Sequence, residues 1–297
     1  LLFYNKLNFE YEKFYWIAFF LSFAVKVPML PFHIWLPEAH VEAPTSGSVL
    51  LAGILLKLGS YGMLRFLIPL FPQASLYFSP FVFLIAIISI VYSSLTAIRQ
   101  TDLKRIIAYA SVAHMNFIVL GLFSVNLQGI EGSILQMISH GLISSGLFFS
   151  IGCLYDRYHT RFIYYYGGLA HTMPLFSCIL FIYILANMSI PGSSSFIGEL
   201  LILVGVFEYN TVIAIFSIIG MFLGGVYSLL FYNRICFGNI KNNYLKIFYD
   251  LTYREFLIHI FLIFNIFLLG IYPTIFESCL QESITKIIVH IEYSFFS

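Results

Sequence analysis

The chain has 297 residues, of which 60% are hydrophobic, 19% are aromatic and only 10% are charged. A soluble protein usually carries about 25% charged residues, so this composition excludes a water-soluble globular domain of this length. The formal net charge of +1 provides no basic field, and we therefore expect no nucleic-acid partner. The cysteines share no close spacing, which argues against a zinc site, a CxxC redox pair and a disulfide framework; they are Cys153, Cys178, Cys236 and Cys279.

Apolar stretches of roughly 18 or more residues recur along the whole chain and predict an all-α polytopic membrane protein. A closed β-barrel is disfavoured, because it would need short alternating segments of about ten residues. We expect eight transmembrane helices, two of them discontinuous, in a domain at 1–275 that is followed by an amphipathic tail at 276–297. The predicted spans are 14–40 (interrupted), 45–66, 76–98, 102–124, 130–154, 174–207 (interrupted), 211–236 and 255–274.

The basic residues orient these spans. When the spans alternate across the membrane, nine of the 15 Lys and Arg residues fall on one side, four on the other and two inside. The positive-inside rule places the side with nine in the cytoplasm or matrix, and both termini then face the opposite compartment. The nine are Arg99, Lys104, Arg105, Arg157, Arg161, Arg234, Lys241, Lys246 and Arg254, and the four are Lys6, Lys13, Arg65 and Lys286.

Five ionisable residues lie deep within the predicted spans. Lys26, Lys57, His114 and His140 lie roughly 15–18 Å from the start of their spans, which is close to the midplane of a core about 30 Å thick. Glu199 lies roughly 12 Å from the non-basic end of its span. A charge at the midplane costs about 2.5–3.5 kcal/mol, so such residues normally face a bundle interior or a wet path. Because these residue types exchange protons, the row predicts a proton relay in the membrane plane.

Two of the predicted helices are interrupted, and each interruption lies next to one of these ionisable residues. Pro28 and Pro31 follow Lys26, and the run Pro191–Ser195 precedes Glu199. Proline removes a backbone donor and opens the helix, and freed backbone groups at membrane depth are tolerated only inside protein or beside a wet cavity. Two such breaks in corresponding places are typical of an antiporter-like inverted-repeat architecture, of which this chain would contain part.

Structural interpretations of these residues stay open beside the functional one. The lysines could snorkel to an interface, and the histidines and Glu199 could simply hydrogen bond to neighbouring helices. We expect Lys104, at the start of its helix, to be an interfacial anchor more than a relay member. His33, Glu38 and His40 cluster before the second span, where we expect a hydrated loop, with metal ligation as the alternative.

Four sequence runs resemble the chain-4 family of NADH:ubiquinone oxidoreductase, respiratory complex I. They are KVPMLPFHIWLPEAHVEAPTSGSVLLAGILLKLGSYGMLR (Lys26 to Arg65), RQTDLKRIIAYASVAHMNF (Arg99 to Phe117), MISHGLISSGLFF (Met137 to Phe149) and SIPGSSSFIGELLIL (Ser189 to Leu203). Glu199 in the GEL motif fits this family better than its sister antiporter-like chains, which carry lysine there. The resemblance extends from about Phe14 to Phe276, and it implies that the eight spans match the seventh to fourteenth of the family's fourteen helices.

The resemblance implies a proton-translocating membrane-arm subunit, driven by NADH-to-ubiquinone electron transfer elsewhere in the complex. Lys26 would be the lysine of the broken seventh helix, Lys57 the central lysine of the eighth, His114 and His140 the connecting histidines, and Glu199 the terminal proton site of the broken twelfth. The FMN, iron–sulfur clusters and ubiquinone would bind in other subunits, and this chain would hold no cofactor or metal. The implied partners are other membrane-arm subunits, including neighbouring antiporter-like chains, together with lipids.

One departure from the family concerns Lys26. The family pairs this lysine with a glutamate on its fifth helix, which the sequence does not contain. We therefore expect the first six helices to come from a separate chain or to be missing from this one, which opens at Leu1. The abundance of Phe (33) and Tyr (21) fits an AT-rich organellar genome and favours the mitochondrial inner membrane.

Two alternative functions follow from the same residues. One is a subunit of a multi-subunit sodium/proton antiporter, against which the GEL glutamate and the HVEAPTSGS run (His40 to Ser48) argue. The other is a purely structural subunit whose channel has decayed.

Overall fold

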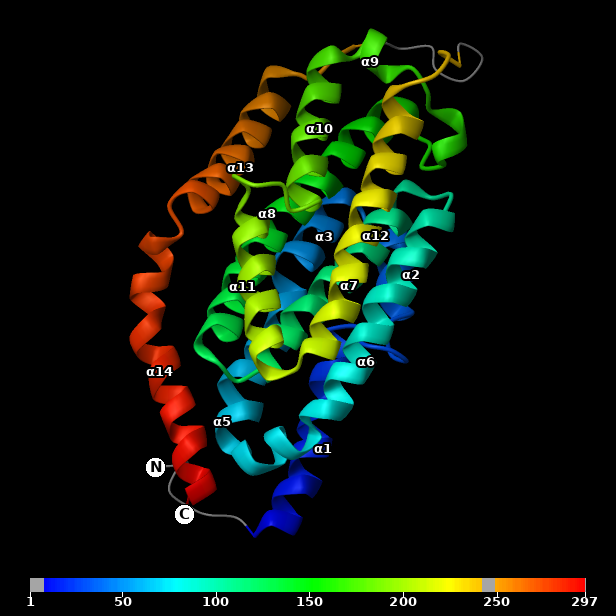
Figure 1. Cartoon of the computed structure of the whole chain (residues 1–297). Helices are drawn as coiled ribbons and strands as arrows, with labels where there is room; N and C mark the ends of the chain where they lie inside the picture. Colours follow the sequence, from blue (N-terminus) through cyan, green and yellow to red (C-terminus); the bar gives the residue numbers. More distant parts are fainter. Residues whose placement is uncertain (1–7, 242–248, 297) are drawn as a thin grey trace.

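The computed structural model describes residues 8–241 and 249–296, so the predicted positions of Leu1, Lys6 and Lys246 lie outside the described residues. In these ranges the chain is a bundle of helices (Figure 1). The β-structure within them is one isolated bridge between Asp102 and Phe162. The all-α prediction is confirmed.

Six continuous helical segments are long and apolar enough to cross a membrane. The first, Thr45–Leu70, is built from α3 (Thr45–Leu50), the π-helix η1 (Leu51–Leu55), α4 (Leu56–Gly62), the π-helix η2 (Met63–Leu67) and α5 (Ile68–Leu70). The others are α6 (Pro72–Arg99), α7 (Leu103–Phe123), α8 (Leu127–Tyr158), α12 (Thr211–Cys236) and α13 (Tyr253–Ile271).

The two remaining predicted spans are helix pairs separated by a break. The first pair is α1 (Phe9–Lys26) with α2 (Trp35–Glu42), and the second is α10 (Pro174–Asn187) with α11 (Ser194–Tyr209). Six continuous and two discontinuous spans reproduce the predicted eight. The described chain also contains the short η3 (Ile163–Tyr165) and α9 (Leu169–Thr172), and ends with α14 (Thr274–Phe296).

Side chains from neighbouring helices satisfy the backbone groups that the breaks release. At the first break, the Leu30 amide donates to Ser89 Oγ at 3.0 Å, and Asn116 Nδ2 donates to the Pro28 carbonyl at 3.4 Å. At the second break, the backbone turns through Gly192 with a φ of +97°, and the Ser195 hydroxyl donates to the Ala186 carbonyl. Each break is therefore a built feature of the bundle, because an unpaired backbone group at this depth would be costly.

Two central helices organise the bundle. α7 is buried along almost its whole length and α8 along most of it, whereas α13 lies at the periphery (Figure 1). α7 carries apolar residues on all sides, as expected of a helix that is surrounded by others. The candidate residues His114 and His140 lie on these two helices, at the centre of the molecule.

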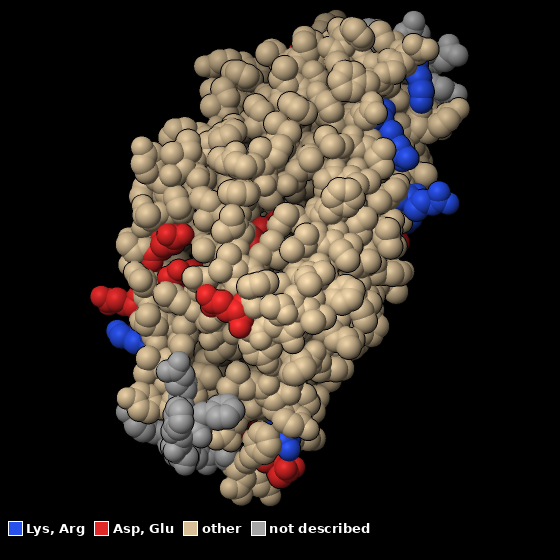
Figure 2. Space-filling view, viewed as in Figure 1, with Lys and Arg blue, Asp and Glu red and all other residues tan. Residues whose placement is uncertain are grey.

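The described basic residues mark the two ends of the bundle. At one end, Arg157 Nη2 pairs with Glu255 Oε2 at 2.7 Å, which joins the end of α8 to the start of α13. At the same end, Arg161 Nη1 donates to the Val41 carbonyl at 3.1 Å. At the opposite end, Lys13 lies over the ring of Tyr77 near the start of α6. Figure 2 shows several Lys and Arg side chains together at one end of the visible face. We call the end with Arg157 and Arg161 the basic end.

The tail forms α14, which packs against α5, α6 and α8. Its Ile284 and Ile291 are buried, and His290 Nε2 lies 3.2 Å from the Pro69 carbonyl in α5. α14 therefore meets the bundle at the end opposite to the basic end, where α6 begins.

Glycines bring α8 and α11 into direct backbone contact. A β-carbon at Gly132 would lie 2.8 Å from both the Gly198 carbonyl oxygen and the Ile202 nitrogen, which is closer than real β-carbons approach backbone atoms. Gly198 immediately precedes Glu199. The close approach of these two helices thus sets how near Glu199 comes to α8.

We expect Gly132→Ala to push α11 away from α8 and to destabilise the subunit by about 1–3 kcal/mol, the usual cost of overpacking. The matched control is Gly225→Ala in α12, where a β-carbon would meet only the Met188 methyl group at 3.5 Å. This control should be neutral or slightly stabilising, because alanine favours helix over glycine. Native electrophoresis and the apparent melting temperature of the solubilised complex measure both variants. Equal behaviour of the two variants would contradict this account of the α8–α11 contact.

Candidate functional site

Four of the five predicted site residues form one continuous row across four helices. Lys57 Nζ in α4 lies 2.7 Å from His140 Nδ1 in α8. The ring centroids of His140 and of His114 in α7 lie 5.5 Å apart. His114 Nδ1 lies 3.0 Å from Glu199 Oε1 in α11. The depth argument predicted that Lys57, His114 and His140 share a level in the membrane, and the structure brings these three residues into direct succession with Glu199.

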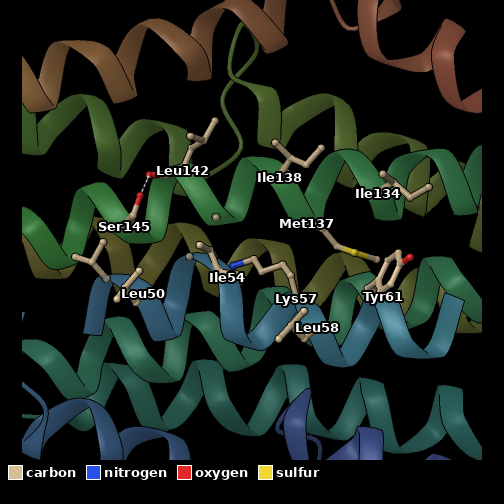
Figure 3. Close-up of a pocket in the computed structure, with 13 residues that line it drawn as sticks. Leu50, Ile54, Lys57, Leu58, Tyr61, Ile134, Met137, Ile138, Leu142 and Ser145 are labelled. Carbon is tan, nitrogen blue, oxygen red and sulfur yellow. Dashed lines mark hydrogen bonds between the residues drawn. The ribbon is translucent and has the colours of Figure 1, made fainter. Parts of the chain in front are cut away.

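The local backbone around Lys57 is irregular. α4 lies between the π-helices η1 and η2, and π-helical turns are frequent at functional sites. Besides its contact with His140, Lys57 Nζ donates to the Ala52 carbonyl at 2.5 Å. Figure 3 shows the side chain extending back along its own helix towards Ile54. The ammonium group is therefore held between a carbonyl of its own helix and the imidazole of α8.

Lys57 also lines an apolar groove between the segment Thr45–Leu70 and α8 (Figure 3). The groove has a volume of ≈ 560 Å³, and Ile54, Met137 and Leu142 are among its walls. The row thus begins at a groove on the surface of the described chain and runs inward, through His140 and His114, to Glu199, which is buried.

Two further polar residues complete the inner end of the row, and sequence reasoning missed both. Gln136 Nε2 donates to Glu199 Oε1 at 3.0 Å, and Tyr227 OH lies 3.3 Å from His114 Nε2. Gln136 precedes His140 by four residues, so the helical period alone places the two on one face of α8. No comparable signal singles out Tyr227 among the 21 tyrosines.

Lys26 is the one predicted site residue that the structure does not join to the row. It ends α1 and is exposed, and it has no hydrogen bond or ion pair to the part of the chain that the structure describes. Its β-carbon nevertheless packs against Gly59, two residues after Lys57. Lys26 therefore lies beside the helix that carries Lys57, the first residue of the row. Its ammonium group has no anionic partner among the described residues.

The residues before the second span are not in a hydrated loop, and that expectation is wrong for both histidines. His33 and His40 are buried. The His40 ring stacks on Phe148, with centroids 4.4 Å apart and planes 12° apart. Glu38 pairs with Arg105 at 3.1 Å. The cause is tertiary packing, since α2 folds against α7 and its His40 is turned inward, whereas Glu38 stays exposed. Across residues 8–241 and 249–296, no group of three or more His, Cys, Asp or Glu could hold a metal ion.

Lys104 connects two elements at the basic end. It is buried, and its Nζ donates to the Ala43 carbonyl, between α2 and α3, at 2.6 Å. This contact ties the start of α7 to the start of the segment that carries Lys57. The geometry agrees with the expected role of an anchor.

The arrangement can pass a proton between neighbouring groups. Hydrogen-bond distances separate Lys57 from His140 and His114 from Glu199. The two imidazoles, whose ring centroids lie 5.5 Å apart, are near neighbours with no direct hydrogen bond between them. Gln136 donates to the carboxylate and holds it in place. The site has the chemistry of a relay, with a base or acid on each of four helices.

Comparisons with known proteins agree with the fold. A family model described as "NADH:quinone oxidoreductase/Mrp antiporter, TM" matches residues 2–229. The chain is 60% identical over 275 residues to NADH-ubiquinone oxidoreductase chain 4 of Marchantia polymorpha, covering 93% of this chain and 56% of the relative. The predicted resemblance to that family is confirmed. The chain thus spans about half the length of the curated relatives it matches.

Solved structures share the architecture. Respiratory complex I from Thermus thermophilus contains a chain that superimposes with a TM-score of 0.88 at 29% identity, covering 96% of this chain and 61% of that one. A chain of the Mrp complex from a Dietzia species gives a TM-score of 0.82 at 16% identity, covering 92% and 60%. At 16% identity, the similarity to the Mrp chain indicates a shared fold and nothing further.

We expect Gln136→Leu to destabilise the subunit more than Tyr227→Phe. The leucine leaves a buried carboxylate without one of its donors, which costs about 1–3 kcal/mol. The phenylalanine removes a single hydroxyl and costs about 1 kcal/mol or less. The apparent melting temperatures of the two solubilised variants measure the difference. The reverse order would show that the amide of Gln136 does not support Glu199.

Proposed function

The chain belongs to the NADH:quinone oxidoreductase/Mrp antiporter transmembrane family, and from this premise we propose that it translocates protons as a membrane-arm subunit of respiratory complex I. One observation carries the proposal: Lys57, His140, His114 and Glu199 form a row across four helices at the centre of the bundle. Ionisable residues at this depth are costly and normally mark an ion pathway. A subunit with a purely structural role would not need four ionisable residues in succession.

In this proposal the proton moves within the membrane plane. Lys57 gives a proton to His140 across their 2.7 Å contact, and the proton then passes to the neighbouring ring of His114. His114 then passes the proton to Glu199 across 3.0 Å. The first two transfers each neutralise one cation and create the next, and the third joins the proton of His114 to the Glu199 carboxylate and neutralises both groups. Tyr227 and Gln136 hold His114 and Glu199 in position.

The energy for this movement comes from electron transfer between NADH and ubiquinone in other subunits. FMN, iron–sulfur clusters and ubiquinone bind there, and this chain contributes the proton path. The partners proposed here are the other membrane-arm subunits, including neighbouring antiporter-like chains, and the surrounding lipids. The family membership and the likeness to a chain of complex I support this assignment.

Lys26 requires a partner of acidic character. It is exposed at the end of a membrane-spanning segment, and a lysine facing lipid at the midplane costs about 2.5–3.5 kcal/mol. We propose that helices equivalent to the remainder of the longer relatives cover it and offer a carboxylate. These helices are either part of the same polypeptide or of a separate chain. Lys26 would then switch between that carboxylate and the row that begins at Lys57.

The proposed location is the mitochondrial inner membrane. The end with Arg157 and Arg161 would face the matrix. The start of α1 and the end of α14 lie at the opposite end of the bundle, which would face the intermembrane space. The domain at 1–275 would span the membrane, and the tail from 276 would lie on its surface.

A second candidate is a subunit of a multi-subunit sodium/proton antiporter. The family model and the shared fold with the Mrp complex favour it. Co-purification with flavin-containing subunits would decide for complex I, and sodium transport in a flavin-free assembly would decide for the antiporter.

We expect Lys57→Met to reduce NADH-driven proton pumping by at least about tenfold, because it removes the group that starts the row. The matched control is Lys13→Met, which removes a lysine at the far end of the bundle and should pump normally. His140→Ala should be milder than Lys57→Met, because water can occupy the space of the ring. Acidification of inverted membrane vesicles, normalised to assembled complex on native gels, measures all three. An assembled Lys57→Met complex with undiminished pumping would exclude the transport role.

A further inference from the structure

One polar side chain lies deep in the membrane-spanning part of α13, the peripheral helix of the bundle (Figure 1). Asn265 is about 18 Å from the start of α13 at Tyr253 and about 9 Å from its end at Ile271. Only 11% of the spanning window of α13 is buried inside the described bundle, and Asn265 is only partly covered. Its carboxamide therefore lies within the hydrocarbon core, at the outer surface of the described chain.

The carboxamide of Asn265 is mostly unpaired among the described residues. Its Nδ2 donates to the Phe261 carbonyl, one turn back in the same helix, at 2.7 Å, and this is its one hydrogen bond to the described chain. An asparagine side chain offers two N–H donors and an oxygen with two lone pairs, so the oxygen and one N–H remain. Acyl chains contain no donor or acceptor, and an unpaired polar group in hydrocarbon is costly. Lipid alone therefore does not satisfy this side chain.

Contacts on the inner face of α13 prevent the helix from turning Asn265 into the bundle. His259 Nδ1 lies 3.1 Å from the Tyr183 hydroxyl in α10, and Ile266 is completely buried. Gly270 lies directly against the backbone at the break between α10 and α11, where a β-carbon would clash. His259, Ile266 and Gly270 fall on one side of the helix, and Asn265 lies about 120° around the axis from them. The outward position of Asn265 is thus fixed by the packing of α13.

The surroundings of Asn265 are apolar and aromatic. Phe261 and Phe264, the most exposed residues near it, are 67% and 62% exposed. This face is separate from the face of Lys26, because α1 packs against α4 and α6, whereas α13 packs against α8, α10 and α11. Membrane helices associate through close packing and through hydrogen bonds between polar side chains. An apolar surface around one unpaired amide fits another membrane-spanning helix.

We propose that the outer face of α13 is a docking surface for a membrane-spanning helix of a neighbouring subunit, which carries a hydrogen-bonding side chain opposite Asn265. That side chain is a hydroxyl or a carboxamide, since each offers a donor for the Asn265 oxygen and an acceptor for its remaining N–H. A charged partner would add the cost of a charge at this depth. The inference goes beyond the proposed function, because docking at α13 requires no movement of protons.

The test compares Asn265→Leu with Asn265→Gln in the whole complex. Leucine has nearly the volume of asparagine but no hydrogen-bonding group, whereas glutamine keeps the carboxamide. We expect Asn265→Leu to lower the share of this chain that stays with other membrane-arm subunits during detergent extraction by about three- to tenfold. Asn265→Gln should retain more. The matched control is Asn233→Leu, near the exposed end of α12, which should behave like the unaltered complex. Native electrophoresis with quantification of the co-migrating subunits measures all three.

A photoactivatable benzoylphenylalanine in place of Phe264 identifies what covers this face. A crosslink to a different polypeptide of the complex is expected. Crosslinks to lipid only, or to a second copy of this chain, would overturn the proposal, as would normal retention of Asn265→Leu or equal losses in Asn265→Leu and Asn265→Gln. If Asn265→Leu does not accumulate, the crosslink alone decides.

Proton pumping separates this test from the proposed function. Assembled Asn265→Leu complex should pump normally, and Lys57→Met should lose pumping while its subunits stay together. Failure of either expectation therefore leaves the other standing.

Discussion

The rest of the structure depends on the cost of holding ionisable groups inside an apolar bundle. Two histidines and a glutamate are buried, a lysine lies at the inner side of an apolar groove, and these side chains find partners in one another. The contact of Lys57 with His140 fixes α4 against α8, and the contact of His114 with Glu199 fixes α7 against α11. Four helices are thereby set relative to one another by polar contacts. The glycines of α8 and α11 allow this, because larger residues would hold Glu199 away from Gln136 and His114.

The irregular backbone also lowers the cost of burying these ionisable groups. A regular helix buries its own polar groups and leaves none for an ion, whereas a break or a π-turn releases carbonyls and amides beside the charged side chains. Lys57 uses such a carbonyl, that of Ala52, and Glu199 follows the break at Gly192 by two helical turns. The freed groups that face the interior are taken up by Ser89, Asn116 and Ser195. Part of the irregular backbone therefore lies at the level of the row.

Much of this arrangement could be predicted from the sequence, because depth in a membrane follows from counting residues along a helix. Counting residues along each predicted helix placed His114 and His140 at one depth in the membrane, and in the structure their rings are neighbours. Depth says nothing about rotation around a helix axis or about which helices touch. For that reason Tyr227 was not foreseen, and Lys26, at a similar depth, is exposed and apart from the row. His40 was expected in a hydrated loop, and tertiary packing, with α2 against α7 and the His40 ring on Phe148, buries it.

A row in the membrane plane does not by itself move a proton across the membrane. Transport requires that the two ends of the row communicate with opposite surfaces, and the described chain is asymmetric in the required sense. At the basic end, Lys104 ties the start of α7 to the start of the segment that carries Lys57. The Glu199 end lies in α11, which runs from the break at Gly192 towards the opposite end. In the proposed relay, a proton that leaves Lys57 passes from His140 through His114 to Glu199. The geometry thus gives the row a direction, provided that its two ends never open to the same side at once.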